Sequence, residues 1–328
     1  MKHSRRDFML GATGALAAPL LPAWAHAGAF PERPLRMIVP FAPGGNVDAT
    51  ARVVGAGMTE AMHATAVVEN KPGAGGSIGA DMVVRSPADG YTLLVGSNGP
   101  LTVNPFIQAH LPYDPLQDLA PVAMVGYVPH VIVINPSIPA RNLTELVALS
   151  KTRHINTGTS GVGSATHLTL IRLNAMTGAQ LVHVPYRGGG ALIPDLLGGS
   201  LDATLTEFST VLPLLRANKV RVIAVASEQR MALAPEIPTV IEAGVPKFLA
   251  SSYVGVLAPA KTPAPVLAAL QQGVTASLTN SAIAGKLSEL GVVAASEQQR
   301  SSAGFKQFLQ AEYENAKQAV KLAGIKPE

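Results

Sequence analysis

The chain has 328 residues, of which 48% are hydrophobic and 14% are charged, so it can build a large core and is not a disordered protein. Its length favours two lobes or domains, and its net charge of only +4, with no Lys or Arg run and 5% aromatic residues, argues against a nucleic-acid-binding surface. The absence of Cys excludes a disulfide framework and a lipoprotein cysteine.

Residues 1–27 have the pattern of an export signal. A basic start precedes the apolar stretch Leu10–Leu21, and Ala25-His26-Ala27 fits a small-x-small cleavage pattern. The segment Ser4–Met9, SRRDFM, resembles a twin-arginine signal, and an ordinary secretory signal is the alternative. Because the apolar stretch is too short to span a bilayer comfortably, we expect cleavage near Ala27, rather than a retained anchor, and a soluble periplasmic protein.

Apolar runs then alternate with Ala-rich helical patterns, which is typical of βαβ units around parallel sheets. In chain order we expect a strand at Leu35–Val39, a helix at Asp48–Ala61, a strand at Ala66–Glu69, a helix at Gly76–Arg85, and strands at Thr92–Gly96 and Pro121–Val133. There follow a helix at Leu143–Ser150, capped by Asn142, a strand at Ile155–Gly158, a helix at Ser164–Met176, a strand at Val182–Pro185 and a short helix at Leu192–Leu197. The rest is expected to contain strands at Ala203–Glu207, Val220–Ala226 and Ala250–Leu257, then helices at Val266–Leu278, Ser281–Leu290 and Ser301–Leu322.

The loop between the first strand and the first helix is rich in Gly and Pro. It lies in Val39–Arg52, which reads VPFAPGGNVDATAR. Its adjacent glycines let a ligand approach the backbone, and the unpaired N–H groups that open the next helix suit an anion. Similar glycine clusters follow apolar runs at Gly73–Gly79, Gly158–Ser164 and Gly188–Gly190. We expect these loops to converge on one cleft.

Seven segments, in order along nearly the whole mature chain, resemble the Bug family, the tripartite tricarboxylate transporter substrate-binding proteins. They are VPFAPGGNVDATAR, VVENKPGAGGSIGADMV, SPADGYTLLVGSNG, GVGSATHL, HVPYRGGGALIPDLLGGSLDA, PEIPTVIEAG and LAPAKTPAPVLAAL. The resemblance implies an α/β, type II periplasmic binding protein fold, with two lobes, each a mostly parallel sheet flanked by helices, and a ligand cleft between them. We assign residues 28–125 and 250–328 to lobe 1 and residues 126–249 to lobe 2.

The resemblance also implies a function and a site. A small carboxylate would be held between the lobes by backbone N–H groups, hydroxyls and water, and hinge closure would present it to a membrane permease or serve sensing. The matching positions are Phe41, Pro43, Gly44, Gly45 and Asp48 in the first loop, Ser77 and Ile78 in the second, Ser97 and Asn98 at a strand end, Thr159, Ser160, Gly163 and His167 at a helix start of the other lobe, and Arg187 after VPY.

Several of these residues also have a purely structural interpretation. Asp48 could stabilise its helix start, and His167 could be a hydrogen-bonded core histidine; we favour these interpretations over ligand contact. For Arg187, a solvated surface charge and an anion contact stay equally open. The hydroxyl groups could cap helices, which is compatible with ligand contact.

One departure from the family pattern bears on the ligand. Where many members have an Asp-Asn pair after the strand that begins near Asp202, this chain has Thr206 and Glu207. In amino-acid-binding members an acid near there can meet the ammonium group of the ligand. The change disfavours an amino acid, although Glu207 could substitute, and it favours a di- or tricarboxylate or an aromatic acid.

The main alternative function is a serine hydrolase, because Gly75–Gly79 matches the G-x-S-x-G pattern with Ser77 as nucleophile. However, Lys71–Ala74 separates Ser77 from the preceding strand, and no later histidine is marked out as its base, although His167 and His183 follow in the chain. A purely structural or interaction protein would leave the glycine-rich loops without a purpose. We therefore predict a receptor and not an enzyme.

Cofactor and metal motifs are missing from the sequence. The phosphate-binding pattern G-x-x-x-x-G-K-[ST] does not occur, and the 8 His residues lack metal-ligand spacing. We predict no cofactor and no metal. The expected partners of this monomer are a small carboxylate and the subunits of a permease.

Overall fold

The computed structural model describes residues 30–322, 324, 325 and 327. The predicted export signal, residues 1–27, therefore lies outside the described residues. Across the part of the chain that is described, no helix combines the length and the apolar character needed to cross a bilayer.

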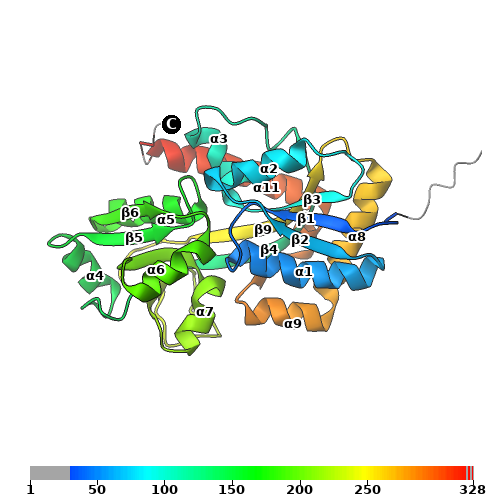
Figure 1. Ribbon diagram of the computed structural model, residues 1–328. Coiled ribbons are helices and arrows are strands. Elements are labelled where there is room, and N and C mark those ends of the chain that lie inside the picture. Colours follow the sequence, from blue (N-terminus) through cyan, green and yellow to red (C-terminus); the bar gives the residue numbers. More distant parts are fainter. Residues whose placement is uncertain (1–29, 323, 326, 328) are drawn as a thin grey trace, which may run out of the picture.

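Ten strands of the described residues are joined by hydrogen bonds and serve two lobes; eight of them follow one path, and the other two each pair with a strand of that path (Figure 1). One lobe contains β1 (Leu35–Val39), β2 (Ala66–Asn70), β3 (Thr92–Gly96) and the short β10 (Val293–Ala294). The other contains β5 (Ile155–Thr159), β6 (Leu181–Pro185), β7 (Ala203–Glu207) and β8 (Arg221–Val225). The strands β4 (Leu119–Ile134) and β9 (Ser251–Pro259) lie between these two sets, in the order β2-β1-β3-β9-β4-β7-β5-β6, and β8 and β10 each pair with β4 beside this path.

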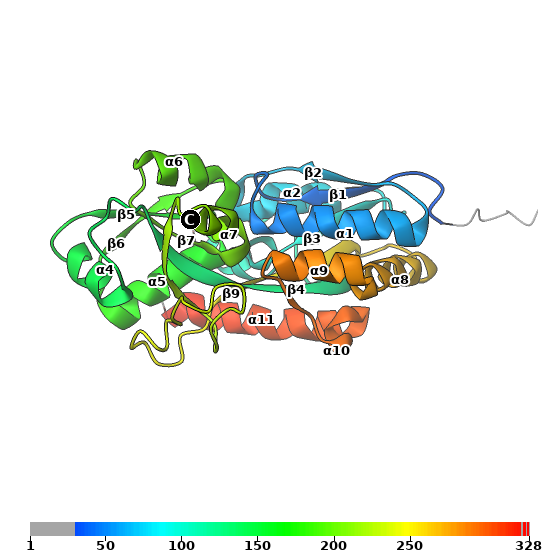
Figure 2. The same cartoon turned by 90° about the horizontal axis from the view of Figure 1, so that it is seen from below.

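β4 belongs to both sheets. Its first part, Leu119–Pro129, pairs antiparallel with β9, and its last part, His130–Ile134, pairs antiparallel with β7 and β8. Figure 2 shows this long strand running along both lobes. The outer strands are parallel, as β1 is with β2 and β3, and β5 with β6 and β7. The sequence predicted the parallel strands but not the antiparallel pairing of the crossing strands, and the lobe boundaries assigned from it stay a prediction.

Helices cover the sheets of both lobes (Figures 1 and 2). The first lobe has α1 (Asn46–Met62), α2 (Ser77–Val84), α3 (Asn104–Ile107), α8 (Ala264–Thr279), α9 (Ser281–Glu289), α10 (Glu297–Arg300) and α11 (Ser302–Leu322), with the short turns η1 (Ala74–Gly76) and η2 (Gly99–Val103). The second has α4 (Leu143–Ser150), α5 (Ala165–Thr177), α6 (Ile193–Gly198), α7 (Phe208–Arg216) and the turn η3 (Gly189–Leu192). The end of α11 packs towards α5, because Val320 shares a cluster with Leu168.

The local sequence explains most of these elements. β3 is buried along its whole length, which is why it appears as an unbroken apolar run. Asn142 accepts a hydrogen bond from the backbone N–H of Glu145 at 2.9 Å, which confirms it as the N-cap of α4. All the expected strands and helices are present, with ends that differ by a few residues. The sequence missed α7, which contains Pro213, the helical segment η2–α3 at 99–107, and the short elements β10 and α10.

Candidate functional site

Loops from both lobes enclose a small cavity, which we call the cleft cavity. Its lining residues are Phe41, Gly45, Asn46, Val47, Ser97 and Gly99 from one lobe, Ser160, Ser164, Ala165, Gly189 and Glu207 from the other, and Ser252 from β9. Its volume is about 20 Å³, which is enough for ordered water but far below the roughly 300–1,000 Å³ of typical small-molecule pockets. The lobes are therefore closed against each other.

Direct contacts between the lobes account for this closure. The backbone N–H of Ala42 donates to the carbonyl oxygen of Arg187 at 2.9 Å, and Ser209 Oγ donates to Asn46 Oδ1 at 3.3 Å. At the rim, a Cβ atom on Gly190 would overlap the carbonyl oxygen of Pro43. Glycine at this position is thus a condition for the close approach of the two lobes.

Three buried polar atoms around the cleft cavity have no hydrogen-bond partner among the described residues. They are Asn46 Nδ2, Ser160 Oγ and Thr210 Oγ1. Asn46 and Ser160 line the cavity from opposite lobes, and Thr210 lies next to it, because a Cβ on Gly189 would be 3.4 Å from Thr210 Oγ1. A buried donor without an acceptor costs about 1–3 kcal/mol. The cavity therefore offers donors to an acceptor such as a carboxylate oxygen.

The start of α1 adds to this donor character. Its N-cap residue, Gly45, makes no side-chain cap hydrogen bond, so the first N–H groups of a 17-residue helix stay available at the cavity wall. The positive end of the helix dipole points the same way. Both effects favour a negatively charged group in the cleft cavity.

A second, larger cavity adjoins the first at the rim. It has a volume of about 230 Å³ and is lined by Gly73–Gly76 of one lobe and by Gly161, Val162, Pro185, Tyr186 and Arg187 of the other, together with Phe41 and Ser160. Because Phe41 and Ser160 line both spaces, they stand at the junction. The side chain of Arg187 is exposed at this rim, so its two interpretations stay open.

Asp48 supports the first loop and does not line either cavity. Its carboxylate is 4% exposed, forms an ion pair with Arg52 at 2.9 Å, and accepts hydrogen bonds from the N–H of Gly44 and from Asn70. Burial acts to raise the pKa of Asp48, but these three partners outweigh it and hold that pKa below its usual range. The geometry agrees with the role at the helix start that the sequence analysis favoured.

His167 supports the glycine loop of the other lobe. Its ring stacks on His183 with centroids 4.0 Å apart, and its Nδ1 accepts from the N–H of Gly163 at 3.3 Å. His183 Nε2 lies 2.7 Å from Thr159 Oγ1, so Thr159 and Gly163 belong to the same support. Burial, followed by the neighbouring His183, lowers the pKa of His167 to about 4. The ring is therefore neutral near pH 7.

Ser77 lies outside the lining of both cavities. Its Oγ accepts from Asn104 Nδ2 at 2.7 Å and donates to Gln108 Oε1 at 3.0 Å. Amide partners cannot activate a serine as an imidazole does, so the hydrolase alternative has no support in the geometry.

The remaining predicted site residues fall into two groups. Phe41, Gly45, Ser97, Ser160 and Glu207 line the cleft cavity. Pro43, Gly44, Ile78, Asn98 and Thr206 do not: Pro43 and Gly44 are exposed at the rim, Ile78 is 53% exposed, Asn98 accepts from the N–H of Tyr253, and Thr206 Oγ1 donates to Glu207 Oε2. Contact of these residues with a ligand stays a prediction.

The sequence analysis missed several lining residues, namely Asn46, Val47, Gly99, Ser164, Ala165, Gly189 and Ser252. Asn46 directly follows Gly45 in the quoted loop and could have been included on that ground. Ser252 had no local signal, because it lies on a strand far along the chain from the loops that it meets.

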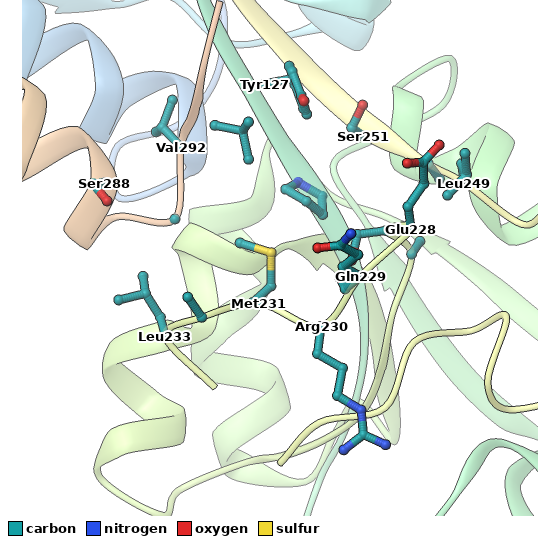
Figure 3. A pocket seen from close by; sticks show the side chains of 17 residues that line it. Tyr127, Glu228, Gln229, Arg230, Met231, Leu233, Leu249, Ser251, Ser288 and Val292 are labelled. Atoms are coloured by element: carbon teal, nitrogen blue, oxygen red, sulfur yellow. The ribbon is translucent and has the colours of Figure 1, made fainter. Parts of the chain in front are cut away.

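A much larger cavity lies elsewhere, and we call it the hinge groove. It has a volume of about 620 Å³ and is bounded by Tyr127 and Pro129 of β4, the loop 226–233, Leu249–Ser251, Ser288 and Gly291–Val293 (Figure 3). Ser251 lines the groove and Ser252 lines the cleft cavity, so the two spaces lie on opposite faces of β9. Within the described residues, none that lines the groove carries a buried polar atom without a partner.

Comparisons with known proteins agree on one family. Residues 50–325 match the family model described as "Tripartite tricarboxylate transporter family receptor". Protein BugT of Bordetella pertussis is 37% identical over 295 residues, which covers 88% of this chain and 89% of BugT. R. palustris Rpa4515, solved with adipate, has a TM-score of 0.87 and 31% identity over 91% of this chain and 100% of that chain. MatC (Rpa3494) from Rhodopseudomonas palustris, solved with bound malate, has a TM-score of 0.84 and 30% identity over 89% and 100%.

Proposed function

The chain belongs to the tripartite tricarboxylate transporter family of receptors, and we propose that it captures a small organic carboxylate in its cleft cavity. In this proposal the protein is exported to the periplasm. There it delivers the carboxylate to the permease subunits of a transporter or reports it to a sensor. The family consists of solute-binding receptors rather than enzymes.

One observation carries the choice of a carboxylate. Asn46 Nδ2 and Ser160 Oγ are buried, lack partners among the described residues, and line one cavity from opposite lobes. An acceptor with two oxygen atoms could engage both, and the open start of α1 would stabilise its charge. The bound adipate and malate of two related structures support the same ligand class.

Capture follows from the arrangement of the hinge. With the lobes apart, the carboxylate meets the α1 start and Asn46 on one lobe. Bending of β4 and β9 then brings Ser160 and Gly189 against it, and the lobe contacts at Ala42 and Gly190 exclude water. Since the closed cavity holds about 20 Å³, a ligand longer than one carboxylate group would extend past Phe41 into the rim cavity or hold the lobes slightly apart.

Thermal unfolding of the purified protein against a panel of mono-, di- and tricarboxylates, aromatic acids and amino acids tests the proposal. A carboxylate at ~100 times its dissociation constant should stabilise the fold by about 2.7 kcal/mol. The control is Asn46→Asp, which keeps the size and the Oδ1 acceptor but places a negative charge in the cavity, and which should lose that stabilisation. A panel in which no carboxylate stabilises the protein would contradict the proposal.

A further inference from the structure

Glu207 is a buried carboxyl group in the wall of the cleft cavity. It is 6% exposed, and its Oε1 lies 2.8 Å from Ser252 Oγ. None of the other residues that line the cavity carries a charge or titrates near neutral pH. Among the described residues Glu207 forms no ion pair. Asp48, the other buried carboxylate of the cleft region, is paired with Arg52. An ionised Glu207 would thus be an uncompensated buried charge.

The groups around Glu207 come from several elements. Thr206 precedes it on β7, Thr210 lies on α7, and Ser252 lies on β9; all three carry hydroxyl groups. The nearest titratable group in this chain of contacts is His130 of β4, whose Nε2 lies 2.8 Å from Ser252 Oγ. The next charged group is Arg172 of α5. Its charge lowers the pKa of His130 but is not among the causes that shift the pKa of Glu207.

The protons along this chain can be assigned by counting. Thr169 Oγ1 donates to the carbonyl oxygen of Ala165 at 2.9 Å, and its single proton is then used. It must therefore accept from His130 Nδ1, 2.8 Å away, so the ring proton is on Nδ1. A neutral ring with its proton on Nδ1 has a bare Nε2, which accepts the only proton of Ser252 Oγ.

Ser252 then has no proton left for Glu207. At 2.8 Å the remaining contact is a hydrogen bond only if Glu207 donates to Ser252 Oγ, which requires a protonated carboxyl group. As long as Thr169 Oγ1 donates to Ala165, a Ser252 that donates to Glu207 would need a doubly protonated His130, but burial and then Arg172 lower the pKa of His130 to about 3. Burial also raises the pKa of Glu207, against the smaller effects of its hydroxyl partners.

From this geometry we infer that Glu207 is a neutral carboxylic acid in the closed receptor, and that it selects ligands whose bound end is a carboxylate without an ammonium group. The inference rests on the proposed function, because it names the ligand class of that same site. A neutral acid does not repel an incoming carboxylate. It also supplies no negative charge to an ammonium group, which would be buried among donors without a counter-charge.

A ligand-free measurement tests the protonation state. Infrared difference spectra between the wild type and Glu207→Gln at neutral pH should show the C=O band of a protonated carboxyl group, present in the wild type and lost in the variant. The matched control is Glu228→Gln, which changes an exposed glutamate of the hinge groove and should leave that band in place. Nitrogen NMR of the ring of His130 should show the neutral form with its proton on Nδ1. The inference would be overturned if the infrared band were the same in the wild type and in Glu207→Gln, or if the proton of His130 were on Nε2.

Malate and aspartate form a matched ligand pair, because they differ by a hydroxyl against an ammonium group, and adipate extends the set. We expect the wild type to be stabilised by malate or adipate and not by aspartate. Glu207→Gln, which keeps the size and neutrality of the acid, should keep the same ligand preference, with malate or adipate bound and aspartate not bound. A gain of more than about tenfold in the variant, or binding of aspartate by the wild type, would overturn the inference. If no carboxylate of the full panel binds at all, the proposed function fails, whereas the infrared and NMR results still decide the state of Glu207.

Discussion

The cleft cavity and the hinge groove lie on opposite faces of β9 and differ in both size and chemistry. The hinge groove has a volume of about 620 Å³, against about 20 Å³ for the closed cleft cavity. Around the small cavity stand three buried polar atoms without partners among the described residues, whereas no residue lining the groove has one. In a receptor whose lobes close on each other, the volume of the cleft depends on whether the hinge is open or closed. Unpaired buried donors that gather around one cavity indicate a binding site.

The largest expected effect comes from blocking closure without touching a ligand contact. Gly190→Ala would place a methyl group against the carbonyl oxygen of Pro43, which is possible only with the lobes apart. We expect carboxylate affinity to fall at least about 100-fold, or about 2.7 kcal/mol, as measured by calorimetric titration.

Gly198→Ala is the control for that variant. Gly198 lies in the same lobe at the end of α6, and nothing stands within 4 Å of a Cβ placed there. The carboxylate affinity of Gly198→Ala should stay close to that of the wild type. The unfolding temperatures of Gly190→Ala and Gly198→Ala should both stay close to that of the wild type. Equal affinities in Gly190→Ala and Gly198→Ala would show that closure does not depend on the rim contact.

Acid should lower the stability of the fold through protonation of His167, which supports the glycine loop at the cleft. The pKa of this residue is about 4 in the fold, below the ordinary 6.5, so its contribution to stability is present above pH 6.5 and is lost as the pH falls towards 4. We expect the free energy of unfolding to drop by on the order of 2 kcal/mol over that range. Chemical denaturation as a function of pH should show a smaller drop for His167→Gln, and parallel curves would argue against the assignment.

Removing an unpaired donor should have a smaller effect than blocking closure. Asn46→Ala loses Asn46 Nδ2, and with it one hydrogen bond to a carboxylate, together with the long contact from Ser209 across the lobes; we expect a loss of about 1–1.5 kcal/mol, or roughly tenfold in affinity. Calorimetric titration measures it. Unchanged affinity would mean that the ligand does not use this donor. The unpaired donors would then no longer distinguish the cleft cavity from the hinge groove as the binding site.

The smallest effect is expected in the hinge groove. Gln229 is exposed there, and among the described residues its one side-chain hydrogen-bond partner is Ser227, whose Oγ donates to its backbone carbonyl oxygen. Gln229→Ala should therefore leave carboxylate affinity unchanged within about twofold in the same titration. A loss as large as that of Asn46→Ala would reverse the comparison and make the groove a binding site.

The sequence predicted the elements better than their assembly. Strands such as β3 and helices such as α4 follow from apolar runs and from the cap Asn142, which are local signals. The double use of β4 depends on pairing with β9 more than a hundred residues away, for which no local pattern exists. No helix was predicted at α7, which contains Pro213, a residue that is unfavourable inside a helix.

The residues of the candidate site also divide into those that could be predicted from the sequence and those that could not. Gly45, Ser160 and Glu207 entered the prediction through the resemblance to the family, and all three line the cleft cavity. Whether Asn46 Nδ2 has a partner, or whether Ser252 meets both Glu207 and His130, depends on the closed arrangement of two lobes. Such contacts are properties of the assembled cleft and have no signal in the sequence.

A crystal structure with the carboxylate that stabilises the protein most is the most direct test of the account. We predict a carboxylate group in the cleft, within hydrogen-bonding distance of Asn46 Nδ2 and Ser160 Oγ, beside the start of α1. A ligand seated in the hinge groove, or bound in the cleft without contact to either donor, would contradict the account.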